Sequence, residues 1–230
     1  MISHVYFDFF GTLVDYDSSV HPSAANAPHK FTIRAGLSLD EAQANELWQR
    51  AWTELDTEAE RTGRECSMLG IAAQYAKLLA DSVGEFEVHR ADLQQLVTEY
   101  LDAWTADIRL AESAAECLED LARDHTVAVV SNTHDADLVP RMLRRFGIEQ
   151  YVSHVFASVD LGWRKPHPAI FEAVLRHDGI PASQAAFVGD NWTADVEGPL
   201  AAGMVAFYVG APSPGRLPTT LGAIPALVRG

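Results

Sequence analysis

The hydrophobic positions of this chain fall into short unbroken runs and into longer stretches with helical spacing. Ile2–Phe7 is a short apolar, β-branched and aromatic run that indicates a buried strand. Similar runs follow much later, at Thr126–Val130, Val152–Ala157, Ala185–Val188 and Val205–Val209. Helical patterns lie between them, at Ala114–Arg123, Asp135–Phe146, Pro168–His177 and Asp195–Ala202. Strand alternating with helix predicts an α/β fold with an open, doubly wound parallel sheet.

A different pattern separates the first predicted strand from the second. No run there has strand character, and helical spacing fills Leu39–Arg61, Met68–Ser82 and Val88–Trp104. Such a stretch is too long for a crossover connection. We therefore expect an inserted α-helical domain over residues 15–104, placed over the strand ends as a cap, and a core made of residues 1–14 and 105–230. The tail after Gly210 is rich in Pro and Gly, which predicts irregular structure.

Small or acidic polar residues stand directly after three of the predicted strands. They are Asp8, Ser131 and Asp190. In open α/β sheets, ligands bind beyond the carboxyl ends of the strands. We therefore expect these residues to meet at one edge of the sheet and to form a site there.

The net charge of the chain argues against strongly anionic binding partners. The formal net charge is −15, from 32 acidic and 17 basic side chains. This excess repels nucleic-acid phosphates and anionic lipid headgroups, so neither nucleic acid nor a membrane is an expected partner. A small anionic substrate remains compatible with the charge if a local basic pocket holds it. Monomer and homodimer both remain open.

Cysteine usage and the absence of apolar spans point to a cytoplasmic protein. Cys66 and Cys117 lack the spacing of a zinc site and are expected to be reduced thiols. The N-terminal residues lack the basic start and apolar core of a signal peptide. No apolar stretch approaches the ~20 residues that span a bilayer.

The first candidate motif follows the first strand and reads Asp8-Phe9-Phe10-Gly11-Thr12-Leu13-Val14-Asp15. A carboxylate here can attack an electrophilic centre and form a covalent intermediate that water later cleaves. Gly11 permits a close loop, and Thr12 can support the carboxylate by a hydrogen bond. For this motif alone, an aspartate that merely caps a turn is the favoured alternative.

The second and third motifs offer groups that bind anions. Ser131-Asn132-Thr133 ends a predicted strand, and its hydroxyl and amide groups can hold an anionic oxygen, although they equally suit a helix N-cap. Lys165, within Arg164-Lys165-Pro166-His167-Pro168, is a cation that can offset developing negative charge. A solvated surface lysine is the alternative interpretation.

The fourth motif reads Val188-Gly189-Asp190-Asn191-Trp192-Thr193-Ala194-Asp195. Asp190 ends a predicted strand, and Asp195 begins the next predicted helix. Two carboxylates at this spacing can converge on one cation, and hard oxygen ligands suit Mg²⁺. Helix N-capping is the alternative role of Asp195.

In their order and strand-end placement, the four motifs resemble those of the haloacid dehalogenase-like hydrolase superfamily. The resemblance covers residues 1–14 and about 105–210, and it implies a Rossmann-like core. The long helical insertion is similar to the C1-type cap of subfamily I of that superfamily. The resemblance implies that Asp8 is the nucleophile and that Lys165 steadies the charge of the transferring group.

The same resemblance implies that Ser131 and Asn132 bind the transferring group. Together with Thr12 and Thr133 they form the predicted substrate-binding set. Mg²⁺ is the implied cofactor, held by Asp8, the backbone carbonyl of Phe10 and Asp190, with Asp195 in support.

Phe10 departs from the pattern of the superfamily's phosphatases and is the most informative catalytic position. Those enzymes carry a second aspartate two residues after the nucleophile, where it serves as general acid and base. Phenylalanine cannot transfer a proton, and the loss of a positioned acid or base typically lowers the rate ~10²–10⁴-fold. His134 and His167 lie near two of the motifs and are candidate replacements, although a surface or capping role is favoured for both.

An aromatic residue at this position is similar to the 2-haloacid dehalogenase branch, because a halide leaves without a proton. The fourth motif differs from that metal-free branch, and Gln49 stands where its cap carries an arginine. We favour Mg²⁺-dependent phosphate ester hydrolysis, because three converging carboxylates without a cation would disfavour an ionised nucleophile. A 2-haloacid dehalogenase and a non-catalytic binding protein remain as alternatives.

Substrate specificity is expected to come from the cap, as it does from loops and lids on other rigid scaffolds. Candidate residues there are Tyr16, His21, Arg61 and Arg64.

Overall fold

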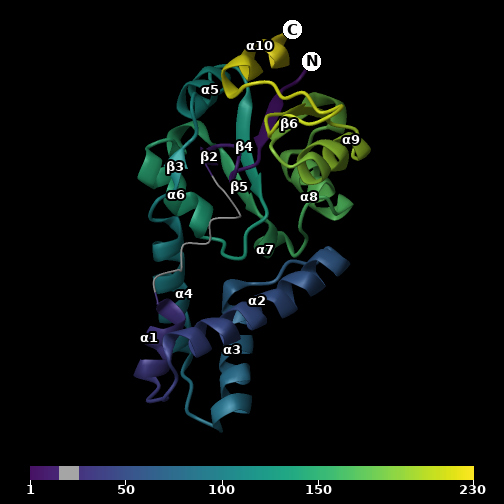
Figure 1. The fold of residues 1–230 in the computed structure, drawn as a ribbon. Coiled ribbons are helices and arrows are strands. Elements are labelled where there is room, and N and C mark those ends of the chain that lie inside the picture. Colours follow the sequence, from purple (N-terminus) through teal and green to yellow (C-terminus); the bar gives the residue numbers. More distant parts are fainter. Residues whose placement is uncertain (16–25) are drawn as a thin grey trace. The chain divides into compact units, whose positions relative to one another are not determined.

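The computed structural model describes residues 1–15 and 26–230. The chain divides into two compact units (Figure 1). One comprises Met1–Asp17 and Ile108–Gly230, and the other Ser18–Asp107. The predicted domain limits at 14/15 and 104/105 stay predictions, as does the role of the helical unit as a cap.

The first unit is built on a five-stranded sheet in the order β5-β4-β1-β6-β7, with every neighbouring pair parallel. The strands are β1 (His4–Phe7), β4 (Thr126–Ser131), β5 (His154–Ala157), β6 (Ala185–Gly189) and β7 (Val205–Tyr208). A short antiparallel pair, β2 (Val14–Asp15) with β3 (Arg109–Leu110), stands apart from this sheet. The predicted α/β fold with a parallel, Rossmann-like sheet is confirmed.

Helices pack around this sheet, and those that precede its last strand connect its strands (Figure 1). They are α5 (Ala114–Leu121), α6 (Leu138–Phe146), α7 (Ser158–Leu161), α8 (Pro168–Asp178), α9 (Gly198–Ala201) and α10 (Ile224–Arg229), with short 3₁₀ turns at Glu149–Tyr151, Ala182–Gln184 and Leu221–Ala223. The tail after Gly210 was expected to be irregular. That expectation is wrong for its end, because Ile224 and Val228 of α10 are buried and hold this segment in a helix.

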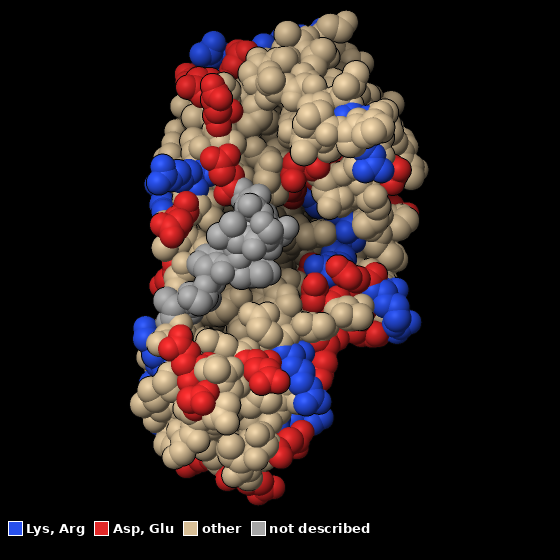
Figure 2. Space-filling view, in the orientation of Figure 1, with Lys and Arg blue, Asp and Glu red and all other residues tan. Residues whose placement is uncertain are grey.

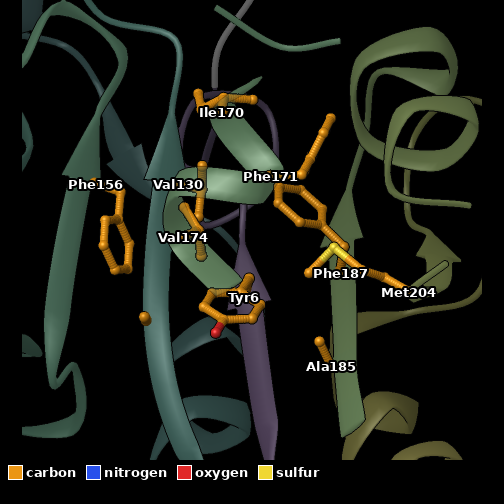
Figure 3. Close-up of a cluster of buried hydrophobic side chains, with 10 residues drawn as sticks. Tyr6, Val130, Phe156, Ile170, Phe171, Val174, Ala185, Phe187 and Met204 are labelled. Atoms are coloured by element: carbon orange, nitrogen blue, oxygen red, sulfur yellow. The ribbon is translucent and has the colours of Figure 1, made fainter. Parts of the chain in front are cut away.

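The hydrophobic core explains why the apolar runs of the strands are unbroken. Figure 3 shows side chains of β1, β4, β5 and β6 meeting those of α8 on one face of the sheet. Tyr6, Phe187 and Phe171 belong to this cluster and are fully buried. Val5 and Phe7, which point to the opposite face, are fully buried as well. A strand covered on both faces has no need of polar positions, as is typical of parallel sheets.

The register of the sheet sets the place of the site. β1 lies at the centre, with Phe7 paired to Val129 of β4 and to Val188 of β6. All three strands run in the same direction, so their carboxyl ends lie at the same edge. The residues that follow Phe7, Val130 and Gly189 are therefore brought together by backbone pairing alone.

The second unit is helical, as predicted. Its helices are α1 (Ala27–Arg34), α2 (Glu41–Thr62), α3 (Met68–Val83) and α4 (Arg90–Thr105). The helix α2 begins at a capping box formed by Asp40 and Gln43, and Ser67 caps α3. The aromatic ring of Trp48 packs against Tyr75 and Tyr100, at 5.5 and 4.9 Å between ring centroids. These contacts give the unit a core of its own.

Surface properties agree with the composition. Figure 2 shows acidic side chains spread over the visible face, in keeping with the 32 acidic and 17 basic residues of the sequence. Among the described helices, none is both long and apolar enough to cross a membrane.

Candidate active site

Asp8 follows the central strand and lies at the carboxyl edge of the sheet. Its backbone N–H donates to the carbonyl of Val188, which continues the pairing of β1 with β6 past the end of the strand. The residue is only 8% exposed. The backbone of Asp8 is therefore held by the sheet, and its side chain is almost withdrawn from water.

Lys165 joins the first and fourth motifs. Its Nζ donates to Oδ1 of Asp8 and to Oδ1 of Asp195, both at 2.7 Å. The residue is 4% exposed, and the ammonium lies 4.9 Å from the ring centroid of Phe187. The surface-lysine interpretation is wrong, because a buried ammonium between two carboxylates is a structured part of the site.

Asp190 lies against the loop of the first motif. Thr12 Oγ1 donates to Asp190 Oδ1 at 3.1 Å. Gly11 has a φ of 86°, a left-handed conformation that favours glycine, and any Cβ built there would overlap the Asp190 carboxylate. Gly11 therefore permits both the turn and the close approach of the two motifs.

Asp195 is fully buried on a turn of π-helix, Trp192–Glu197, which replaces the first part of the predicted helix Asp195–Ala202. Its Oδ2 accepts from the backbone N–H of Asn191 at 2.9 Å, while the side chain of Asn191 caps the turn by accepting from Ala194 N at 3.0 Å. Helix N-capping was the alternative role of Asp195. In the structure Asn191 is the N-cap, and Asp195 points at Lys165 instead. Single-turn π-helices are frequent at functional sites.

Burial dominates the electrostatics of the acidic groups. It raises the pKa of Asp8, although the charge of Lys165 opposes this shift. Burial also raises the pKa of Asp190, with repulsion from Asp195 adding to the effect, and it raises the pKa of Asp195 to about 6. Burial alone would lower the pKa of Lys165, but the charges of Asp195 and Asp8 outweigh it and raise that pKa. Without a further cation, the charge of one ammonium, that of Lys165, balances only one of the three acidic groups.

The donor set fits a hard divalent cation. One carboxylate oxygen from each of Asp8, Asp190 and Asp195 lies within 4.8 Å of the others. Oxygen ligands of this kind suit Mg²⁺ or Ca²⁺ and not the softer metals that thiolates select. The acidic cluster can therefore hold a metal ion.

The predicted substrate-binding residues differ in whether their side chains already have hydrogen-bond partners within the protein. Thr12 bonds to Asp190, and the Thr133 hydroxyl donates to the carbonyl of Asp135 at 3.1 Å. Asn132 bonds to the main chain of Lys165. Ser131 is fully buried, and its Oγ has no hydrogen-bond partner among the described residues. A buried hydroxyl without a partner is costly and is a group that a ligand can satisfy.

The remaining candidate side chains make contacts elsewhere or lie outside the described residues. The Phe10 ring packs edge-on against Phe9, at 5.0 Å between centroids. His167 caps α8 by accepting from Ala169 N at 3.3 Å, so the favoured capping role is confirmed for it. Arg61 pairs with Glu58 on the exposed surface of α2. Tyr16 and His21 lie outside the described residues.

Sequence reasoning missed two residues that shape the site. Gly189 leaves room for Asp195, because any Cβ built on it would overlap that carboxylate. A glycine between an apolar strand and an acidic residue is the signal that could have identified it. The capping role of Asn191 had a weaker signal, an amide three residues before Ala194.

Comparison with known proteins identifies relatives of this chain. A family model described as haloacid dehalogenase-like hydrolase matches residues 2–203. A glyceraldehyde 3-phosphate phosphatase of Methanothermobacter thermautotrophicus is 26% identical over 210 residues, which span 91% of this chain and 86% of that protein. The human haloacid dehalogenase-like hydrolase domain-containing protein 3 is 40% identical over 86 residues, only 37% of this chain and 34% of that protein.

Solved structures share the fold over the whole length. The crystal structure of a 2-haloacid dehalogenase from Pseudomonas syringae pv. Tomato DC3000 superposes with a TM-score of 0.69 at 25% sequence identity. The match covers 100% of this chain and 99% of that chain.

Proposed function

Because the chain belongs to the haloacid dehalogenase-like hydrolase family, we propose that it hydrolyses phosphate monoesters of small molecules, with Asp8 as the nucleophile and Mg²⁺ as the cofactor. The phosphatase relative that aligns with 91% of the chain supports this choice within the family. The substrate is a small phosphorylated compound.

The observation that carries the proposal is the convergence of three carboxylates, those of Asp8, Asp190 and Asp195. Two of them, Asp8 and Asp195, bond to one buried ammonium, that of Lys165. Three carboxylates and one lysine leave a formal excess of two negative charges. That excess would repel a phosphate group and would favour protonation of the nucleophile. A divalent cation offsets both effects, so Asp190 and Asp195 have a chemical purpose in a metal-dependent phosphatase. A metal-independent enzyme has no such need of them.

The side chains present account for the first half of the reaction. An oxygen of Asp8 attacks phosphorus, a bond from Asp8 to phosphorus forms, and the ester bond breaks with its electron pair leaving on the alcohol oxygen. Lys165 holds Asp8 in place and offsets charge on the transferring oxygens. Bound Mg²⁺, held by Asp8, Asp190, Asp195 and the Phe10 carbonyl, would supply electrostatic stabilisation of that charge.

The second half of the reaction releases the phosphate. Water attacks phosphorus, the bond to Asp8 breaks, and the carboxylate is regenerated while inorganic phosphate leaves. The buried Ser131 hydroxyl is placed to satisfy an oxygen of the transferring group. Phe10 provides no proton for the departing alcohol, so we expect substrates whose leaving group is stable as an anion.

Metal removal and a conservative substitution test the proposal. Turnover of 4-nitrophenyl phosphate should require Mg²⁺, should disappear in excess chelator and should return when Mg²⁺ is added back. Asp8→Asn should be inactive but folded, because it keeps the size of the side chain while removing the nucleophile. Turnover that persists in excess chelator would refute the role of the metal.

A second function, 2-haloacid dehalogenation, is favoured by Phe10 and by the structural match to the Pseudomonas syringae dehalogenase. An enzyme of this kind attacks carbon and releases a halide, which needs no proton donor. It should release halide from short 2-halo acids without added metal. A panel of such acids that yields no halide would exclude it.

A further inference from the structure

The side-chain amide of Asn132 forms two hydrogen bonds with the main chain of Lys165. Its Nδ2 donates to the Lys165 carbonyl at 2.9 Å, and its Oδ1 accepts from the Lys165 N–H at 2.7 Å. Asn132 comes directly after β4, whereas Lys165 lies in the loop between α7 and α8. One side chain therefore ties this loop to the carboxyl edge of the sheet.

These two hydrogen bonds fix the backbone from which the side chain of Lys165 extends. A lysine side chain is a flexible four-carbon stem, and its charge reaches a defined point only when its origin is fixed. Here the Nζ lies 2.7 Å from each of two carboxylates that belong to different motifs. We expect a displaced loop to weaken at least one of those contacts.

We propose that Asn132 is a positioning residue that sets the place of Lys165 by holding its backbone, and that it affects catalysis through Lys165 and not by contact with the substrate. The inference rests on the proposed phosphate ester hydrolysis. It changes the role that the family resemblance implies for Asn132, which was to bind the transferring group. Ser131, whose hydroxyl has no partner among the described residues, keeps that role.

Asn132→Ala should lower kcat with little change in KM. Misplacement of a catalytic group by about 1 Å lowers rates up to roughly 10²-fold, so we expect a loss of about 10- to 100-fold in kcat. KM and the inhibition constant of inorganic phosphate should change by less than about threefold, because no substrate contact is lost.

Ser153→Ala is a matched control. Ser153 Oγ donates to the carbonyl of Val127 at 2.7 Å, so this residue also ties a loop to β4 by a side-chain-to-backbone bond, but at the opposite end of the strand. It should leave kcat unchanged. A loss of activity in both variants with the same loss of stability would show a merely structural role and would overturn the proposal.

A double-mutant cycle separates positioning from substrate contact. Lys165→Met and Asn132→Ala are made singly and together, and residual turnover and phosphate inhibition are measured at high enzyme concentration. If Asn132 acts through Lys165, the double variant should equal Lys165→Met within about threefold. A further loss of turnover or of phosphate affinity in the Lys165→Met background would mean that Asn132 contacts the substrate.

Hydrogen exchange measured by NMR tests the hydrogen bond between Asn132 and the Lys165 backbone independently of any activity. The chain has three lysines, Lys30, Lys77 and Lys165, so ¹⁵N-lysine labelling yields three backbone amide signals, and Lys165→Met identifies one of them. In the wild-type protein this amide should be protected from hydrogen exchange, and Asn132→Ala should remove the protection. Unchanged protection of this amide in Asn132→Ala would overturn the proposal that Asn132 holds the Lys165 backbone. Absence of phosphatase turnover in the wild-type protein, with protection lost as expected, would instead refute the proposed function.

Discussion

At the scale of single residues, one ammonium organises the site. Lys165 bonds to the proposed nucleophile and to Asp195, and its own backbone is held by Asn132. The sequence placed Asp8, Lys165, Asp190 and Asp195 in one site, because each stands in a motif beside a strand end or a helix start. It did not reveal the partner of Asn132, because a bond across 33 residues leaves no periodic signal.

Phe10 yields the sharpest residue-scale prediction. Phe10→Asp should raise turnover of alkyl phosphates by about 10²–10⁴-fold, since it supplies a proton donor where the wild-type protein has none. Turnover of 4-nitrophenyl phosphate should change far less, because its leaving group needs little protonation. The measurement is the ratio of kcat/KM for the two substrates in both proteins.

Phe10→Leu is the control for this prediction, because it alters the ring without adding an acid. It should leave the ratio near the wild-type value. An equal ratio in Phe10→Asp and wild-type protein would mean that another group already protonates the leaving alcohol.

At the scale of elements, strands were easier to predict than the turns that follow them. The strands carry continuous apolar runs because both faces of the sheet are covered, and that pattern is local. The π-helical turn Trp192–Glu197 is held by the cap from Asn191 and by the bond from Asn191 N to Asp195. A helical period alone could not predict such a turn, since its geometry depends on these particular contacts.

Gly189 at the end of β6 offers an element-scale prediction. Gly189→Ala should displace Asp195, because the new methyl group would overlap its carboxylate. We expect a loss of about 1–3 kcal/mol in the free energy of unfolding and a weaker dependence of activity on Mg²⁺. Thermal melting and a Mg²⁺ titration of turnover measure the two effects.

Gly222→Ala is the matched control, because its nearest neighbour, the Ser113 side chain, would lie at an ordinary contact distance of 3.7 Å. It should melt close to the wild-type protein. Wild-type stability and Mg²⁺ dependence in Gly189→Ala would show that the turn adapts without consequence for the site.

At the scale of the whole molecule, the acidic cluster should make stability depend on pH and metal together. Burial raises the pKa of Asp195 from 3.8 to about 6. A carboxyl group with a raised pKa in the folded state stabilises the fold fully below its unfolded pKa, and this contribution is lost as pH rises through the folded pKa. The metal-free protein should therefore lose stability from this group between about pH 4 and about pH 6.

Mg²⁺ should counteract this loss, because it binds the ionised carboxylates. The increase in Tm on addition of Mg²⁺ should be larger near pH 7.5 than near pH 5. Asp195→Asn should weaken the pH dependence of the metal-free protein. An equal Tm increase at both pH values would argue against metal binding at this cluster.

The central claim is that Asp8 forms a covalent bond to the transferring phosphoryl group. Acid quenching during turnover of a ³²P-labelled phosphate ester, followed by peptide mapping, tests it most directly. We predict label on the peptide that contains Asp8 when Mg²⁺ is present, and none in Asp8→Asn. Turnover without labelled protein, or label on a different peptide, would contradict the claim.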